Sequence, residues 1–263
     1  MTLNISPIPA FNDNYIWMFQ CGAEKQVGIV DPGDAAPVLE RLAGQGLQLH
    51  TILITHHHAD HTAGIAQLLE AFPNANVIGS HSSKIASLKQ RCKQGDTVSV
   101  LGLDFEVIEI PGHTLDHIAF YLPSCAALAE GAVFCGDTLF AAGCGRIFEG
   151  EAAMMHASLS KLNALPGTTL VFCAHEYTLA NLGFALAAEP ENTDLQARLL
   201  ATKAMRTANL PSLPSNIALE QRTNPFLRCH NKDLARMVAT HAGKEAHNEI
   251  DTFAQLRAWK DNF

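Results

Sequence analysis

The chain carries Thr55-His56-His57-His58-Ala59-Asp60-His61 directly after Leu49–Ile54, an apolar run typical of a buried strand. The apolar positions between residues 63 and 72 are spaced as in an amphipathic helix. We therefore expect the histidines and the aspartate on the connecting loop and the first helical turn, where side chains from a strand end and a helix start can converge on one point. Core packing does not require such a run, and a solvated polar loop is the alternative.

The side chains of this stretch have the chemistry of metal ligands. Imidazole nitrogens with a carboxylate oxygen favour zinc, iron or manganese over calcium or magnesium, which prefer an all-oxygen shell. His56 and His58 are two residues apart on a strand-like segment, so they are expected to point to the same side. Asp60 and His61 begin a separate group. The segment therefore predicts ligands for two metal ions.

Three further predicted strands also end in a histidine or an aspartate. Residues 103–110 are followed by Pro111-Gly112-His113-Thr114, residues 132–135 by Gly136-Asp137-Thr138, and residues 169–173 by Ala174-His175-Glu176-Tyr177. One such residue alone is most often a cap or a turn residue. Four segments of this kind in one chain make coincidence a poor explanation.

These motifs resemble those of the metallo-β-lactamase superfamily and, more narrowly, those of the hydroxyacylglutathione hydrolase (glyoxalase II) family. The resemblance covers nearly the whole chain, and its narrower part is carried by residues 12–17, 30–33, 142–150 and 223–228. It implies a fold of the α/β (α+β) class, an αββα sandwich of two β-sheets packed face to face with helices outside. A C-terminal α-helical domain is expected to follow.

The resemblance also implies a dinuclear metal site with two divalent ions per chain. Zinc is the first expectation, and iron or manganese are the alternatives. The implied ligands are His56, His58 and His113 for one ion, Asp60, His61 and His175 for the other, and Asp137 as the bridge between them. Asp60 and Asp137, with a hydroxide that bridges the metals, are the expected catalytic groups.

Three residues near these ligands have other expected roles. His57 is expected to point away from the metals, and His117 could be mistaken for a ligand, although the family does not use it so. Asp31 closes the predicted strand 28–30. Histidines that bind metals commonly donate their second N–H to a carboxylate, so Asp31 is a candidate for orienting one of them. The alternative, a turn residue before Pro32, stays open.

The expected reaction is thioester hydrolysis. Two divalent ions with Asp60, Asp137 and a hydroxide leave a net charge of about +1, and such ions lower the pKa of bound water from 15.7 to about 7. The hydroxide would attack the thioester carbonyl, and a thiolate would leave without a dedicated acid. The resemblance implies S-(2-hydroxyacyl)glutathione, in particular S-D-lactoylglutathione, as substrate. Glutathione and D-lactate would be the products, in the second step of the glyoxalase pathway for methylglyoxal detoxification.

The resemblance places the glutathione part of the substrate near five side chains. The carboxylates of glutathione are natural partners for guanidinium and ammonium groups. The implied contacts are Arg146, Phe148, Tyr177, Arg228 and Lys232. Phe148 stands where some family members have a tyrosine. For the three cations the alternative is a solvated surface charge, and Tyr177 could instead pack its ring against the second domain.

Strand-like and helix-like stretches alternate up to about residue 175, after which helical patterns prevail. We therefore expect a metal-binding catalytic domain over residues 1–174 and a helical substrate-binding domain over residues 175–263. The helices predicted there are 178–188, 194–208, 232–242 and 250–259, with a connector at 210–215.

Composition bears on partners and location. The net charge of −8 and the lack of Lys/Arg runs argue against a nucleic-acid partner. No stretch approaches the ~20 apolar residues of a membrane-spanning helix, and the N-terminal residues do not resemble a signal peptide. The seven cysteines are expected to be free thiols in a reducing compartment, and Cys135 and Cys173 are expected to lie in the core. These features predict a cytoplasmic protein, which we expect to be a monomer.

Four other functions are compatible with parts of this pattern. A mono-iron glutathione persulfide dioxygenase shares the first metal cluster but should not need the long helical C-terminal part. The scaffold also serves β-lactamases, which are exported, and tRNA-processing nucleases, for which the acidic composition is unfavourable. A non-catalytic metal-binding module would be indicated by a lost ligand, and none is lost here.

Overall fold

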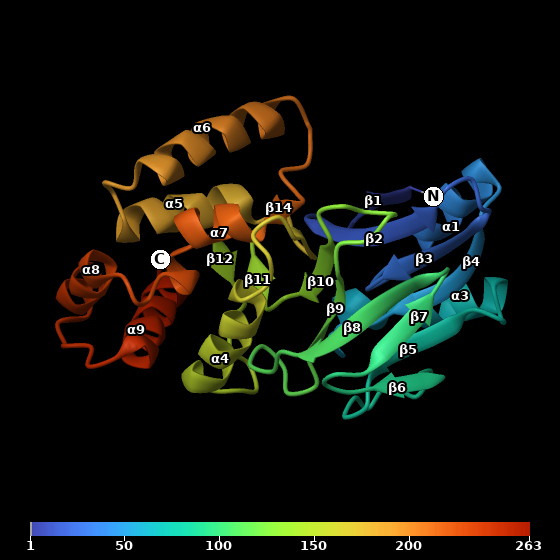
Figure 1. The fold of residues 1–263 in the computed structure, drawn as a ribbon, viewed down its shortest axis with the longest axis horizontal. Helices are drawn as coiled ribbons and strands as arrows, with labels where there is room; N and C mark the ends of the chain where they lie inside the picture. The colour runs from blue at the N-terminus through green and yellow to red at the C-terminus, as the bar shows by residue number, and fades with distance from the viewer. Residues whose placement is uncertain (1) are drawn as a thin grey trace. The chain divides into compact units, whose positions relative to one another are not determined.

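The structure is a computed structural model that describes residues 2–263 (Figure 1). Its internal contacts divide the chain into two compact units. The first unit extends to Glu109 and resumes at Thr114–Gly136, and the second comprises Ile110–His113 and Asp137–Phe263. These units are defined by contacts and are not continuous in sequence, so they do not test the domain boundary expected between residues 174 and 175. That boundary stays a prediction.

The first unit contains a six-stranded sheet in chain order. Its strands are β1 (Leu3–Ala10), β2 (Asn14–Cys21), β3 (Gln26–Val30), β4 (Gln48–Leu53), β5 (Asn76–Ser80) and β6 (Gln90–Cys92). The first three are antiparallel, and β3 to β6 are parallel. Parallel neighbours need crossover connections, which are supplied by α1 (Ala36–Gln45) before β4 and by α3 (Ile65–Ala71) before β5.

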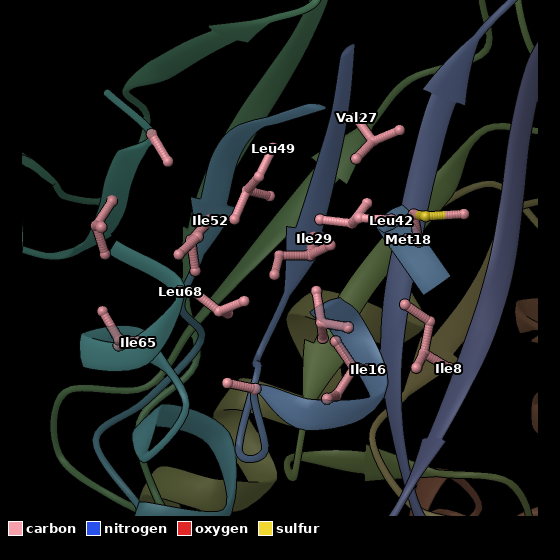
Figure 2. Close-up of a cluster of buried hydrophobic side chains, with 14 of the residues drawn as sticks. Ile8, Ile16, Met18, Val27, Ile29, Leu42, Leu49, Ile52, Ile65 and Leu68 are labelled. Atoms are coloured by element: carbon pink, nitrogen blue, oxygen red, sulfur yellow. The ribbon is translucent and has the colours of Figure 1, made fainter. Parts of the chain in front are cut away.

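A hydrophobic cluster joins this sheet to α1 and α3 (Figure 2). Ile29 and Ile52 from the central strands are fully buried beside Leu42 of α1 and Leu68 of α3. Burying one such side chain contributes about 1.5–3 kcal/mol. The end of β4, from which the histidine-rich segment continues, is thereby held in a well-packed position.

Four more strands of the first unit form an antiparallel arrangement in the order β7 (Thr97–Val100), β8 (Leu103–Glu109), β9 (Ile118–Leu122) and β10 (Ala132–Gly136). Phe19 of β2 packs against Phe105 of β8 and Phe134 of β10, with ring centroids 5.5 and 5.9 Å away. Gly28 makes room for this ring, because a Cβ there would lie 2.1 Å from Phe19 Cζ. The two sets of strands thus pack face to face, with α1 and α3 outside, which confirms the predicted sandwich.

The second unit is mostly helical. Its elements are β11 (Leu139–Phe140), β12 (Gly143–Cys144), α4 (Ala152–Asn163), β13 (Leu170–Cys173), α5 (Thr178–Ala188), α6 (Thr193–Thr207), β14 (Ser215–Asn216), α7 (Ile217–Thr223), the 3-10 helix Pro225–Leu227, α8 (Lys232–Ala242) and α9 (Glu249–Asp261). Four helices start at an asparagine whose side chain accepts backbone N–H bonds, at residues 192, 216, 231 and 248. The predicted C-terminal helices are confirmed within two residues at each end.

One predicted helix differs from the structure. The pattern between residues 63 and 72 forms only α3, and a separate short helix, α2 (Ala59–Thr62), precedes it. The chain bends at Gly64, whose N–H donates to Pro32 O at 3.0 Å and whose missing Cβ would lie 2.6 Å from that same oxygen. Asp60 and His61 consequently lie in α2. Within residues 2–263, none of the helices has both the length and the apolar character needed to cross a bilayer.

Candidate metal centre and active site

In the first unit, Asp31 organises the start of the histidine-rich segment. Its carboxylate accepts hydrogen bonds from Thr55 N at 2.8 Å and Thr55 Oγ1 at 2.7 Å, and it lies 3.1 Å from His61 Nδ1. Thr55 Oγ1 in turn lies 3.1 Å from His56 Nδ1. Both imidazoles therefore use Nδ1 within the protein and keep Nε2 for a metal, as expected when a carboxylate fixes the orientation of metal-binding histidines.

The remaining atoms of this segment have the spacing of metal ligands. His56 Nε2 lies 3.1 Å from His58 Nδ1, and His61 Nε2 lies 3.4 Å from Asp60 Oδ2. Two ligands that share a tetrahedral zinc ion are about 3.4 Å apart. Asn14 adds a hydrogen bond from Nδ2 to Asp60 Oδ2 at 3.2 Å. The four side chains thus form two pairs, each compatible with one ion.

Replacing Asp31 with Asn is expected to weaken metal binding about 10- to 100-fold, because two histidines lose the carboxylate that orients them. The free energy of unfolding of the metal-free protein should also fall by about 1–3 kcal/mol, since Asp31 is buried and accepts several hydrogen bonds. Chelator competition and urea unfolding measure the two effects. Asp34→Asn, in the same turn, is the matched control. Unchanged metal affinity in Asp31→Asn would leave Asp31 as a turn residue only.

In the second unit, Asp137 lies between two histidines. Its Oδ2 is 3.6 Å from His113 Nε2 and 3.4 Å from His175 Nε2. His113 Nδ1 lies 2.8 Å from the carbonyl oxygen of Arg146, which fixes that ring in turn. One oxygen of Asp137 thus lies at the separation expected of two ligands of one metal ion from each of two imidazole nitrogens, which is compatible with a bridging carboxylate.

Gly145 is required for this arrangement. A Cβ at this position would lie 1.9 Å from Asp137 O and 3.2 Å from His113 Nδ1. The backbone at residue 145 can therefore pass close to Asp137 and His113 only because glycine has no side chain.

The two histidines that were not expected to bind metal have partners in the first unit. His57 Nδ1 lies 2.9 Å from Asp116 Oδ1. Burial opposes ionisation of Asp116, but hydrogen bonds from His57, Thr114 and Ser83 outweigh it and hold the pKa of Asp116 below its usual value. The buried ring of His117 stacks on His56 at 4.5 Å.

Comparison with known proteins places this geometry in a family. Residues 12–175 match the family model described as metallo-beta-lactamase superfamily, and residues 176–263 match the one described as hydroxyacylglutathione hydrolase C-terminus. A hydroxyacylglutathione hydrolase of Aeromonas hydrophila is 50% identical over 257 residues, which cover 97% of this chain and 98% of that relative. The chain belongs to the hydroxyacylglutathione hydrolase family.

Other comparisons agree with this membership. The hydroxyacylglutathione hydrolase of Pseudomonas aeruginosa strain LESB58 is 48% identical over 262 aligned residues. The alignment covers 99% of this chain and 100% of that relative. Among solved structures, ETHE1 from Myxococcus xanthus superposes with a TM-score of 0.65 at 25% identity, over 99% of this chain and 98% of its own. The family resemblance and the fold expected from the sequence are therefore confirmed, and the fold with its His/Asp clusters suggests a dinuclear metal site.

In this hydroxyacylglutathione hydrolase family member, three of the side chains expected to contact the substrate belong to residues that contact His113 or His175 in the second unit. Phe148 is 62% exposed and its ring meets His113 edge to face at 5.2 Å. Tyr177 is partly exposed and stacks on His175 at 4.7 Å. Arg146, whose carbonyl holds His113, has an exposed side chain 3.9 Å from Asp261. Two exposed aromatic rings and a cation therefore lie close to predicted ligands.

The other two expected contacts lie elsewhere in the second unit. Arg228 is bound by Glu189, with Nε 3.0 Å from both carboxylate oxygens and Nη2 2.9 Å from one of them. It lines a cavity of about 350 Å³ whose walls include Asp194 and Asp233 but none of the predicted ligands. Lys232 is exposed at the start of α8. Arg228 is thus already neutralised by a carboxylate of the protein.

A group of cations around Arg146 was missed in the sequence. Burial first, and then the positive charges of Arg257 and Arg146, lower the pKa of Lys260. Asp261 accepts from Arg257 Nη2 at 2.9 Å and also faces Arg146. We call Arg146, Arg257, Lys260 and Asp261 the cationic cluster. The available signal was the i, i+3 spacing of Arg257 and Lys260 at the end of the last predicted helix.

All seven cysteines are free thiols, as expected. Cys135 and Cys173, next to Asp137 and His175 in sequence, are buried, and only Cys125 is partly exposed. Burial raises the pKa of Cys144 to about 11 and that of Cys173 to about 12. These thiols belong to the core.

Proposed function

We propose that this protein hydrolyses the thioester of S-(2-hydroxyacyl)glutathione, with S-D-lactoylglutathione as its substrate, to glutathione and D-lactate in methylglyoxal detoxification. Membership of the hydroxyacylglutathione hydrolase family over essentially the whole chain supports the reaction. The observation that carries the proposal is the position of Asp137 between His113 and His175, which suits a bridging carboxylate. The substrate is therefore a small molecule, and we propose that the protein acts as a cytoplasmic monomer.

We further propose that the predicted ligands bind two divalent ions, with zinc the first candidate and iron or manganese the alternatives. His56 and His58 with His113 would hold one ion, and Asp60 and His61 with His175 the other. The nitrogen and carboxylate donors, with their second imidazole nitrogens bound inside the protein, fit such ions. When bound, the ions supply a hydroxide at neutral pH and polarise the thioester carbonyl.

The side chains around the ligands provide the rest of the chemistry. Asp60 and Asp137 contribute negative charge that offsets part of the charge of the cations. Phe148 and Tyr177 shield His113 and His175 from one side and offer aromatic surface to the acyl and cysteinyl parts of the substrate. The leaving thiolate, with a pKa of about 8.5 in its free thiol, needs no proton donor.

We propose that the cationic cluster binds the carboxylates of glutathione. Arg146 and Arg257 share the carboxylate of Asp261, and Lys260 adds a further positive charge next to it in sequence, so the cluster keeps positive charge for an anionic ligand. Arg228 and Lys232, the cations expected from the sequence, are the competing assignment. The ion pair with Glu189 makes Arg228 the weaker candidate.

Lys260→Ala is expected to raise KM for S-D-lactoylglutathione about tenfold with little change in kcat, because one partly buried charge-assisted contact contributes about 1.5 kcal/mol or more. Arg228→Ala should leave KM unchanged and lower only the stability of the helical part. Initial rates over a range of thioester concentrations separate the two. A raised KM in Arg228→Ala with a normal Lys260→Ala would restore the assignment made from the sequence.

A direct assay tests the reaction itself. Purified, metal-loaded protein should consume S-D-lactoylglutathione and release one thiol per thioester cleaved, both followed spectrophotometrically. The same sample should take up no oxygen with glutathione persulfide, the substrate of the dioxygenase alternative. Oxygen uptake without thioesterase activity would replace the proposed reaction, and full metal loading with neither activity would leave a metal-binding module.

A further inference from the structure

The turn between β11 and β12 in the second unit is bound by side chains of α5, α7 and α9 and by Asn224, the residue that follows α7. The hydrogen bonds run from Asn224 Nδ2 to Phe140 O (3.1 Å) and Gly143 O (2.9 Å), from Asn181 Nδ2 to Ala141 O (3.1 Å), from Arg257 Nη1 to Cys144 O (2.9 Å), and from Ala142 N to Glu220 Oε2 (2.8 Å). We call residues 139–144 the metal-loop hairpin. Five polar backbone groups of residues 140–144 are thus bound by side chains from elsewhere in the second unit.

The groups that bind the metal-loop hairpin belong to a buried polar cluster. Asn224 and Glu220 are fully buried, and Asn224 Nδ2 also donates to Glu220 Oε2 at 3.1 Å. Glu220 forms an ion pair with the buried Arg198 at 2.6 Å. Removing one member of such a cluster leaves uncompensated polar groups in the interior, so its geometry is strongly enforced.

The hairpin itself adopts a conformation that needs this support. Ala142 has φ of 57°, in the left-handed region that residues with a Cβ rarely occupy. Its side chain is buried against Leu182 and Ala185 of α5 and Leu195 of α6. A strained residue persists only when its surroundings hold it, and here the helices provide both the packing and the hydrogen bonds.

Short backbone links connect the hairpin to two predicted metal ligands. Asp137 lies two residues before the hairpin, and Gly145 N donates to Thr138 O at 3.2 Å to close its base. The next residue, Arg146, supplies the carbonyl that binds His113 Nδ1. A shift of the hairpin therefore moves the Asp137 carboxylate and the group that orients His113 at the same time.

We infer that Asn224 and Glu220 are positioning residues for the metal centre, which act through the backbone of residues 139–146 on Asp137 and His113. This inference rests on the proposed metal centre. It gives the helical C-terminal region a second task besides substrate binding, because α7 helps to build the metal site. It also explains why segments 142–150 and 223–228, which carry the family resemblance, are both needed in one chain.

Asn224→Ala tests this role, with Val238→Ala in the core of α8 as the matched control for general destabilisation. We expect Asn224→Ala to release metal to a chelator about tenfold faster and to lower kcat about tenfold, with KM within twofold of the wild type. Val238→Ala should lower the urea midpoint but keep wild-type metal release and kcat. Wild-type metal release and kcat in Asn224→Ala, or equal losses in both variants, would overturn the inference.

A second variant and a readout without metal keep the test decisive. If Asn224→Ala does not fold, Asn181→Ala removes only the bond to Ala141 O and should cause a smaller change in the same direction, whereas wild-type behaviour would count against the inference. In metal-free Asn224→Ala or Asn181→Ala protein, amide hydrogen exchange over residues 138–146 should be faster than in the metal-free wild type. Exchange over α8 should remain unchanged. This exchange result stands even if the wild type proves inactive toward thioesters, so the failures of the inference and of the proposed function can be told apart.

Discussion

Asp137→Asn is expected to lower kcat by a factor on the order of 10³ or more and to reduce the metal content below two ions per chain. In the structure, one oxygen of Asp137 faces His113 at 3.6 Å and His175 at 3.4 Å. Asparagine has nearly the same shape but offers a neutral oxygen and an N–H donor in place of a charged carboxylate. The two metal ions would then lose the negatively charged ligand that they are proposed to share. The hydroxide that they supply at neutral pH would be lost as well.

Metal analysis and steady-state kinetics on the same preparation measure both effects. Asp104→Asn is the matched control, because Asp104 is exposed on β8 and its carboxylate accepts a local bond from Ser99. This control should keep wild-type metal content and kcat. An Asp137→Asn protein that carries two ions and turns over normally would refute the bridging role.

Complete metal removal is expected to abolish thioesterase activity and to lower the unfolding temperature by about 10 °C. A ligand at about 1,000 times its dissociation constant stabilises a folded protein by about 4.1 kcal/mol. For a chain of this size, 1 kcal/mol corresponds to about 2–4 °C. Four of the proposed ligands are buried histidines, namely His56, His61, His113 and His175, and Asp137 is buried as well. Without a metal ion, these polar groups are held away from water with no cation to compensate for their lost hydration.

Thermal unfolding and activity are measured before chelation, after it, and after zinc, iron or manganese is added back. Activity and unfolding temperature should return together, and the metal that restores both best identifies the working cofactor. The Asp137→Asn variant is the control, since its unfolding temperature should respond less to the same treatment. A metal-free protein that keeps its activity would rule out the proposed chemistry.

The segments that carry the proposed metal ligands could be recognised in the sequence because each is short and continuous. Thr55–His61 follows a strand of obvious apolar pattern, and His113, Asp137 and His175 each follow another strand within four residues. Residue type and local position carry the information in such segments. The same holds for the C-terminal helices, which begin at asparagine caps and have regular apolar spacing.

Features that depend on contacts between distant segments could not be predicted. The helix expected from residue 63 is interrupted because Gly64 packs on the backbone at Pro32. Arg146 and α9 are brought together by a contact between distant segments, since Asp261 next to Lys260 lies 3.9 Å from Arg146 Nε, more than 100 residues away in sequence. Arg228 had the right charge for a substrate contact, but no local pattern revealed that Glu189 binds it.

The buried thiols have a consequence for a protein that releases a thiol at every turnover. Disulfide exchange proceeds through the thiolate, and a pKa of about 11 for Cys144 leaves on the order of one part in 10⁴ ionised at neutral pH. Cys173 and Cys92, with pKa values of about 12, are less reactive still. The buried thiols are therefore expected to attack glutathione disulfide only slowly under oxidative stress. We expect glutathionylation, which releases one glutathione for each disulfide exchanged, at the partly exposed Cys125 instead.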